Sequence, residues 1–256
     1  MKPFKLAGAI PALVFSLSLG AVTGAHAGSI NPTFQSFGDL NAATSTTVDF
    51  TGDGIPTDPS AIATFAGSNG DTLLLGLTAH QRFANPPLGN DGAGTYSAQA
   101  GANDGTPGNP GNRATWNFAW FAEVIGENGS TLNDYGVTLL YDLDPGIGTD
   151  ESDLGSWDIG ASASADPNIS DTLFQSSQNA TFGFLANDFP GFISAPSFTA
   201  FDPFAAGQYS FALRSTLGEV AINVEVSPVP LPAAGWLLLS AFGGLGLVAR
   251  RRRKAA

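Results

Sequence analysis

The stretch from Ala114 to Phe121 reads A-T-W-N-F-A-W-F, and its regular alternation of side chains indicates the fold class. Successive side chains of an extended strand point to opposite faces, so Trp116, Phe118 and Trp120 share one face. No segment of the chain between its two ends carries a sustained apolar period of 3.6 residues, as an amphipathic helix would. We therefore predict an all-β body, an antiparallel β-sandwich or a jelly-roll-like fold.

Short runs of the same kind lie on both sides of this stretch, separated by Gly, Asn, Asp and Ser clusters that favour turns. The sequence G-S-N-G-D at residues 67–71 predicts a hairpin turn, and L-G-E at residues 217–219 predicts a closing hairpin. The stretch from Asn85 to Arg113 is rich in Gly, Pro and Asn and is expected to be a long loop. The other expected strands are residues 61–66, 72–79, 136–141, 181–185, 209–213 and 220–226.

The N-terminal residues have the pattern of a secretory signal peptide. Lys2 and Lys5 precede an apolar stretch from Leu6 to Leu19, and Ala25-His26-Ala27 forms a small-x-small cleavage site before Gly28. Export through the Sec machinery is therefore expected. The chain contains no cysteine, so its exported body has no disulfide.

The C-terminal residues combine an apolar segment with a cluster of cations. The run from Ala233 to Ala249 is 17 residues long, which as a helix spans about 25 Å, close to the roughly 30 Å of a hydrocarbon core. The positive-inside rule keeps the cations in the cytoplasm, so we predict one transmembrane helix in the inner membrane with the body outside. The cations are Arg250, Arg251, Arg252, Arg253 and Lys254.

Directly before this segment stands Val229-Pro230-Leu231-Pro232-Ala233. Together with the apolar run and the arginines, it resembles the VPLPA variant of the PEP-CTERM sorting signals of Gram-negative bacteria. Leu231 stands where the eponymous P-E-P signal has glutamate, and the resemblance covers about a tenth of the chain. It implies cleavage near the motif by an exosortase, a membrane-embedded cysteine transpeptidase-like enzyme. It also implies an association with exopolysaccharide and with biofilm or floc formation.

These features divide the chain into three parts. They are a signal peptide (1–27), an acidic β-rich extracytoplasmic domain (28–226) and a sorting segment (227–256) with motif 229–233, helix 233–249 and tail 250–254. The domain keeps only Arg82, Arg113 and Arg214 as cations but holds all 22 acidic residues, so its formal charge is −19. Nucleic acid is excluded as an expected partner, because phosphate binding depends on Arg and Lys. Anionic polysaccharide is also repelled unless divalent cations bridge it.

Residue types suited to catalysis are scarce, and we expect no catalytic site. His80 is the only histidine of the mature body, and we expect it at a strand end or on the surface. No G-x-S-x-G, H-E-x-x-H or lysine-bearing phosphate loop is present. The carboxylate pair of a glycoside hydrolase would have to come from Glu123, Glu127 or the aspartates.

A calcium site is one hypothesis for the loop that follows residues 136–141. Five carboxylates lie within residues 142–153, and Ca²⁺ takes six to eight oxygen ligands from such glycine-bearing loops. Pro145 breaks the EF-hand pattern, and the alternative is a solvated acidic loop that protects strand edges. The candidate ligands are Asp142, Asp144, Asp150 and Asp153, with a weaker cluster at Asp49, Asp53 and Asp58.

Aromatic side chains could instead form a sugar-stacking platform. The candidates are Tyr96, Trp116, Trp120, Tyr135, Tyr141 and Trp157. Trp116 and Trp120 share a face with Phe118 and are expected in the core, whereas Trp157 is the better candidate for exposure.

Two functions therefore stay open. One is a non-enzymatic surface or extracellular matrix protein processed by an exosortase; the other is a secreted carbohydrate-binding module or carbohydrate-active enzyme with the same tail.

Overall fold

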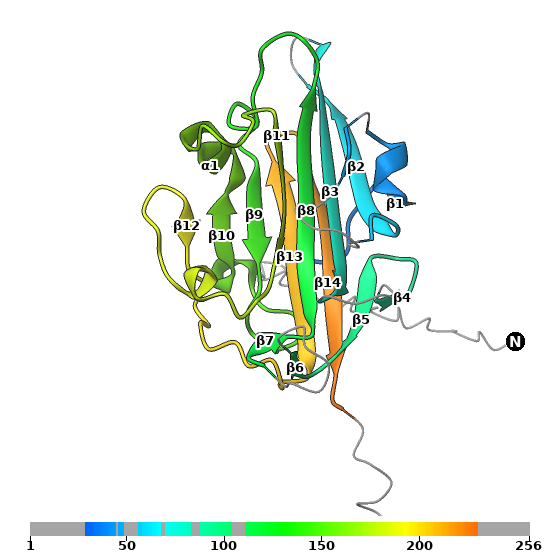
Figure 1. The fold of residues 1–256 in the computed structure, drawn as a ribbon, viewed down its shortest axis with the longest axis vertical. Helices are drawn as coiled ribbons and strands as arrows, with labels where there is room; N and C mark the ends of the chain where they lie inside the picture. Colours follow the sequence, from blue (N-terminus) through cyan, green and yellow to red (C-terminus); the bar gives the residue numbers. More distant parts are fainter. Residues whose placement is uncertain are drawn as a thin grey trace, which may run out of the picture.

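The computed structural model describes residues 29–44, 46–48, 56–67, 70–82, 88–103 and 111–229. These residues form mostly β-structure, in two large sheets and a small two-stranded one (Figure 1). The prediction of an all-β body is thereby confirmed, and most neighbouring strands of its sheets are antiparallel. Among these same residues, no helix has both the length and the apolar character needed to cross a bilayer.

The first large sheet has five strands in the spatial order β1-β2-β3-β8-β11. All of its neighbouring strands are antiparallel. Its strands are β1 (Ser36–Gly38), β2 (Ser60–Ala66), β3 (Thr72–Gln81), β8 (Trp116–Ile125) and β11 (Leu173–Gln178).

The second large sheet has seven strands in the order β12-β10-β9-β13-β14-β5-β4. Its one parallel pair joins β14 to β5, a departure from the purely antiparallel prediction. Its strands are β4 (Gly89–Asn90), β5 (Thr95–Gln99), β9 (Thr138–Tyr141), β10 (Gly155–Asp158), β12 (Ile193–Ser194), β13 (Gly207–Ser215) and β14 (Gly218–Ser227). The small sheet pairs β6 (Ala102–Asn103) with β7 (Arg113–Ala114). The helices are α1 (Ile159–Ala165) and the 3-10 turns η1 (Leu40–Ala42), η3 (Glu151–Asp153) and η4 (Gly183–Ala186).

Both predicted hairpins are confirmed. β2 pairs with β3, the Gly67 N–H donates to the Asp71 carbonyl at 2.8 Å, and Gly70 takes a φ of 85° that favours glycine. β13 pairs with β14 along its whole length, from Gly207 opposite Val226 to Ser215 opposite Gly218.

The core lies between the two large sheets and follows from the alternation in β8. Trp116, Phe118 and Trp120 are at most 1% exposed. The Phe118 ring stacks on Phe211 of β13, with a centroid distance of 4.3 Å. The predicted inward face is therefore the one that packs against the second sheet, as in a β-sandwich.

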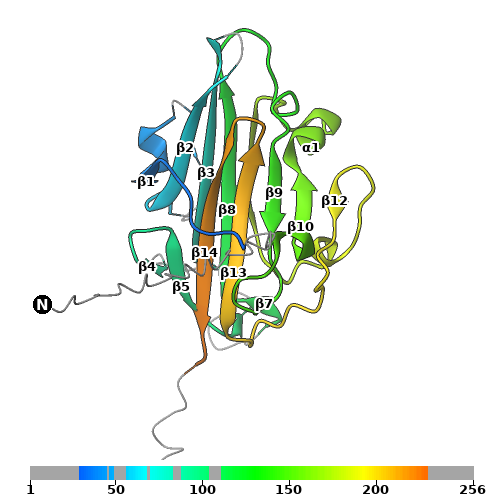
Figure 2. The ribbon, with the colours of Figure 1, turned by 180° about the vertical axis from the view of Figure 1, so that it is seen from behind.

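The outer faces of both sheets are partly covered by the chain between Ser29 and Val48. Ile30 packs with Ala212 and Ala221 on the outside of the second sheet, and backbone bonds join Thr33 to Ala221. Figure 2 shows this N-terminal segment crossing β13 and β14 before it reaches β1. Leu40 then packs on the outside of the first sheet, so the outward residues of β8 are buried as well.

Two local predictions were wrong. The predicted strand at residues 181–185 lies instead around η4, because the Asn179 side chain bonds to the backbone of Ala114, Trp116 and Thr181 and turns the chain out of the sheet. The predicted loop at 85–113 contains β5, whose alternating buried Tyr96 and Ala98 pair with the distant β14. Residues 83–87 and 104–110 lie outside the described ranges.

Candidate functional site

A groove with a volume of about 780 Å³ lies along β10, α1, β11 and the segment from η4 to β12. We call it the Trp157 groove. Five aromatic residues line it: Trp157, Phe174, Phe184, Phe189 and Phe192. Aromatic and apolar walls with a few polar groups are typical of ligand sites of this size.

Trp157 is held in place on two sides. Its ring meets Trp120, Phe174 and Phe184 edge to face, at centroid distances of 5.1, 6.2 and 5.5 Å. Its Nε1–H donates to Ser162 Oγ at 2.8 Å, and Ser162 Oγ–H donates to the Asp158 carbonyl at 2.7 Å. The half-buried indole is therefore fixed before any ligand arrives, with its hydrogen-bond donor already engaged.

The local sequence around Trp157 explains this placement. Gly155, two residues earlier on the same face of β10, faces Tyr141 of β9, and a Cβ there would lie 2.3 Å from the Tyr141 ring. Asp158 ends the strand and caps α1, since its carboxylate accepts the Ala161 N–H at 2.8 Å. Strand and helix thus meet at one residue, which brings Ser162 under the indole.

The opposite rim is a closely bonded turn between η4 and β12. Phe189 and Ile193 form two backbone hydrogen bonds, and the Asp158 N–H donates to the Phe192 carbonyl at 2.7 Å. Asp188 Oδ1 accepts the Ala195 N–H at 2.8 Å. Phe189 nevertheless stays 59% exposed, so a large apolar surface remains open to solvent at this rim.

Among the described residues, the charged side chains that line the Trp157 groove are Asp166 and Asp188, both acidic. The backbone N–H and side-chain amide of Asn168 donate to Asp166 and hold the pKa of its carboxyl below the usual value. None of Arg82, Arg113 and Arg214 lines the groove. The site therefore offers aromatic surface and negatively charged acceptors.

The sequence indicated only Trp157 of this site. Of the six predicted platform residues, Tyr96, Trp116, Trp120, Tyr135 and Tyr141 are at most 4% exposed and belong to the core. The expected burial of Trp116 and Trp120 is confirmed. The sequence analysis missed Phe184, Phe189 and Phe192. One feature of the sequence could have indicated them, because seven phenylalanines lie within residues 182–204.

His80 lies near the end of β3, as expected, but only 3% of it is exposed. Its Nδ1 lies 2.9 Å from the Gln81 carbonyl and its Nε2 lies 2.9 Å from Ser177 Oγ on β11. Because Nδ1 must donate to the carbonyl, Nε2 accepts the Ser177 hydroxyl. Burial lowers the pKa of His80, which favours the neutral form of the ring. The Asn117 amide also donates to Ser177 Oγ, so the group joins three strands on the outside of the first sheet.

Among the candidate carboxylates for glycoside hydrolysis, Glu123 is 8% exposed and accepts the hydroxyls of Thr44 and Thr46. These hydrogen bonds of Glu123 connect the N-terminal segment to β8. Glu127 is exposed beyond the end of that strand.

The predicted calcium ligands each bind groups of the protein itself. Asp142 is 1% exposed, and its Oδ1 accepts the Asp144 N–H; Asp144 accepts from the Gly146 N–H. Asp150 caps η3, and Asp153 accepts the Ser197 hydroxyl. Within the described residues, no group of three or more His, Cys, Asp or Glu side chains is arranged to hold a metal. Calcium at this loop stays a prediction. Asp49 and Asp53 of the weaker cluster lie outside the described ranges.

The predicted processing sites lie almost wholly beyond the described residues. This applies to Ala25 and Ala27, to Pro230, Leu231, Pro232 and Ala233, and to Arg250, Arg251, Arg252 and Arg253. Val229 is described and is 57% exposed, two residues after the end of β14.

Comparison of the chain with models of protein families, with curated proteins and with solved structures found no match.

Proposed function

We propose that this chain is an exported, non-enzymatic surface or extracellular matrix protein, trimmed near Val229–Ala233 by an exosortase and associated with exopolysaccharide. The observation that carries this proposal is the order of segments along the chain. A secretory signal precedes an acidic domain without cysteine, and a proline motif, an apolar segment and four arginines follow it.

The arrangement of the domain supports a processing site at its end. β14 lies between β13 and β5, so the last strand is held on both sides. It runs to the lower end of the molecule in Figure 1 and stops at Ser227. Val229, the first residue of the motif, therefore lies just outside the last strand and is 57% exposed. A sequence with two prolines favours the extended backbone that a protease requires.

Mass spectrometry of intact protein, with and without the exosortase gene, tests this proposal. We expect an extracellular product that begins near Gly28 and ends near the motif, and a membrane-bound chain with its arginines when the enzyme is missing. Substituting Pro230 and Pro232 with alanine should prevent trimming, while Ser227→Ala, just outside the motif, should not. Recovery of the full-length chain from the cytosol with both ends intact would refute the proposal.

The second candidate function is a secreted carbohydrate-binding module or carbohydrate-active enzyme with the same tail. The Trp157 groove favours it, since a fixed indole and exposed phenylalanine lie beside carboxylate acceptors. Binding and sorting are compatible, because the groove and the motif belong to different parts of the chain.

A further inference from the structure

Resting on this second function, we propose that the Trp157 groove binds a segment of an uncharged polysaccharide, with Trp157 and Phe189 against the sugar rings and Asp188 accepting their hydroxyls. The shape of the site is the first argument. A second hollow of about 520 Å³, lined by Thr138, Ser156 and Ser194, lies on the opposite face of β9, β10 and β12 and is not part of the groove. The groove itself is open to solvent along its exposed Phe189 rim, so a polymer can lie along it and leave at both ends, whereas a small molecule would fill only part of its volume of about 780 Å³.

The hydrogen-bonding groups give the second argument. Trp157 Nε1–H is already engaged by Ser162. Asp188 uses Oδ1 for the Ala195 N–H, and its Oδ2 has no hydrogen bond within the described residues. Around the aromatic surface the charged groups are therefore acceptors. A sugar presents C–H groups on its ring faces and hydroxyl donors at its edges, and an O–H bond to a carboxylate is strong.

The charges give the third argument and restrict the class of sugar. Asp166 and Asp188 line the groove, and among the described residues no arginine or lysine lines it. The domain as a whole has a formal charge of −19. Uronic acid polymers and anionic lipid surfaces are therefore repelled, while an uncharged glycan is not.

Native affinity electrophoresis of the full-length chain, in a detergent without a sugar headgroup, tests the proposal. The gels contain hydroxyethylcellulose, galactomannan or dextran as uncharged probes, alginate as the anionic one and chitosan as the cationic one. We expect retardation by at least one uncharged polymer and none by alginate. Trp157→Ala and Phe189→Ala should each weaken that binding about tenfold, as loss of an aromatic anchor does.

The controls separate binding from folding and from export. Phe189 is 59% exposed, so Phe189→Ala keeps the fold if Trp157→Ala does not. Phe204, 63% exposed and outside the groove, is the matched control, and Phe204→Ala should bind like the unmodified chain. Retardation by no uncharged polymer, or retardation unchanged in Phe189→Ala, would overturn the proposal. So would binding to alginate or chitosan alone, or a dimer that Phe189→Ala dissociates. Because the assay uses the unprocessed chain, its failure leaves the sorting proposal intact, and a failure of sorting leaves this result intact.

Discussion

Asp142 is a carboxyl group held in a place that disfavours its charge. It follows β9 directly, and its backbone N–H donates to the Ser210 carbonyl at 3.0 Å. Its Oδ1 accepts one N–H, while its buried Oδ2 has no partner within the described residues. Burial is the main cause that raises the pKa of Asp142 to about 6.

The raised pKa predicts a decline in stability with pH that Asp142→Asn removes. The native chain holds this proton more tightly than the unfolded chain, whose aspartate has a pKa of about 3.9. Stability is therefore lost as pH rises from about 4 through 6, by about 2–3 kcal/mol. The difference in unfolding free energy between the unmodified chain and Asp142→Asn, measured with urea at pH 4 and pH 7.5, isolates this contribution from carboxyls with lowered pKa such as Glu151. Asp142→Asn should be the more stable chain at pH 7.5. Asp144→Asn, two residues away, is the control and should keep the decline.

The same variant tests the calcium hypothesis. If Ca²⁺ binds residues 142–153, it should raise the melting temperature of the unmodified chain and not that of Asp142→Asn, because binding to the native state alone stabilises it. Calorimetric titration without heat would reject the site.

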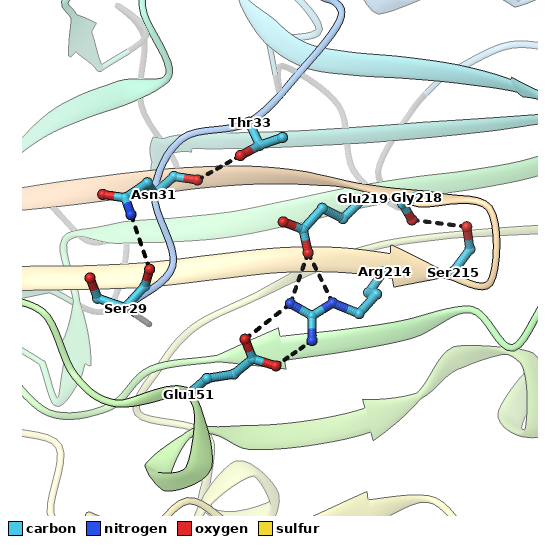
Figure 3. A network of polar contacts seen from close by, with 8 residues as sticks. All are labelled: Ser29, Asn31, Thr33, Glu151, Arg214, Ser215, Gly218 and Glu219. Atoms are coloured by element: carbon cyan, nitrogen blue, oxygen red, sulfur yellow. Dashed lines mark hydrogen bonds and ion pairs between the residues drawn. The ribbon is translucent and has the colours of Figure 1, made fainter. Parts of the chain in front are cut away.

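At the scale of the elements, ion pairs connect η3 with the β13–β14 hairpin. Figure 3 shows Arg214 of β13 between Glu151 of η3 and Glu219 of β14. Arg214 Nε donates to Glu219 Oε2 at 2.9 Å, and its Nη2 lies 3.2 Å from Glu151 Oε2. Hydrogen bonding from Arg214 is the main cause that lowers the pKa of Glu151.

Removal of this ion pair is expected to lower the free energy of unfolding only slightly, and only above acidic pH. A lowered carboxyl pKa stabilises the native state above the unfolded pKa, and the effect is lost as pH falls through the folded value. The Glu151 and Arg214 side chains are each 38% exposed, so Glu151→Gln should lower the free energy of unfolding by less than about 1 kcal/mol at pH 7. At pH 2.5 the variant and the unmodified chain should unfold at the same urea concentration. An equal loss at both pH values would contradict the role of the charge.

α1 depends on a close approach that only glycine permits. A Cβ on Gly160 would lie 2.6 Å from Asn133 Cα and 2.8 Å from the Leu132 carbonyl oxygen. Gly160→Ala should therefore push α1 away and lower the free energy of unfolding by about 1–3 kcal/mol, measured by urea denaturation. Because Ser162 moves with α1, Gly160→Ala should also weaken retention by the glycan. Gly183→Ala, where a Cβ meets nothing within 4 Å, is the matched control and should change neither.

For the whole molecule, the residues just after the predicted signal cleavage site act as part of the fold. Ile30 is 7% exposed in a cluster with Leu154, Ala212 and Ala221. Thr33 exchanges backbone bonds with Ala221 at 3.0 and 2.7 Å. The segment thereby shields the outer face of the second sheet.

Ile30→Ala is expected to destabilise the whole domain by about 2 kcal/mol, the lower end for a buried isoleucine. Thermal unfolding measures this as a lower melting temperature of a single transition. Exposed Asn31→Ala, the adjacent control, should stay within about 0.5 kcal/mol. If Ile30→Ala has no effect, the N-terminal segment does not contribute to the fold.

The sequence by itself determined the β class, both hairpins and the burial of Trp116, Phe118 and Trp120, because alternation and turn chemistry are local properties. It also carries the export and sorting prediction, which depends on contiguous segments. Only the tertiary structure decided which aromatic residues stay open to solvent and that Asp188 joins Trp157 in one groove. It also decided that Ser177 binds His80 from 97 residues away and that β5 pairs with β14 in parallel. These outcomes depend on contacts between distant segments, where one long-range partner outweighs the preference of a short stretch.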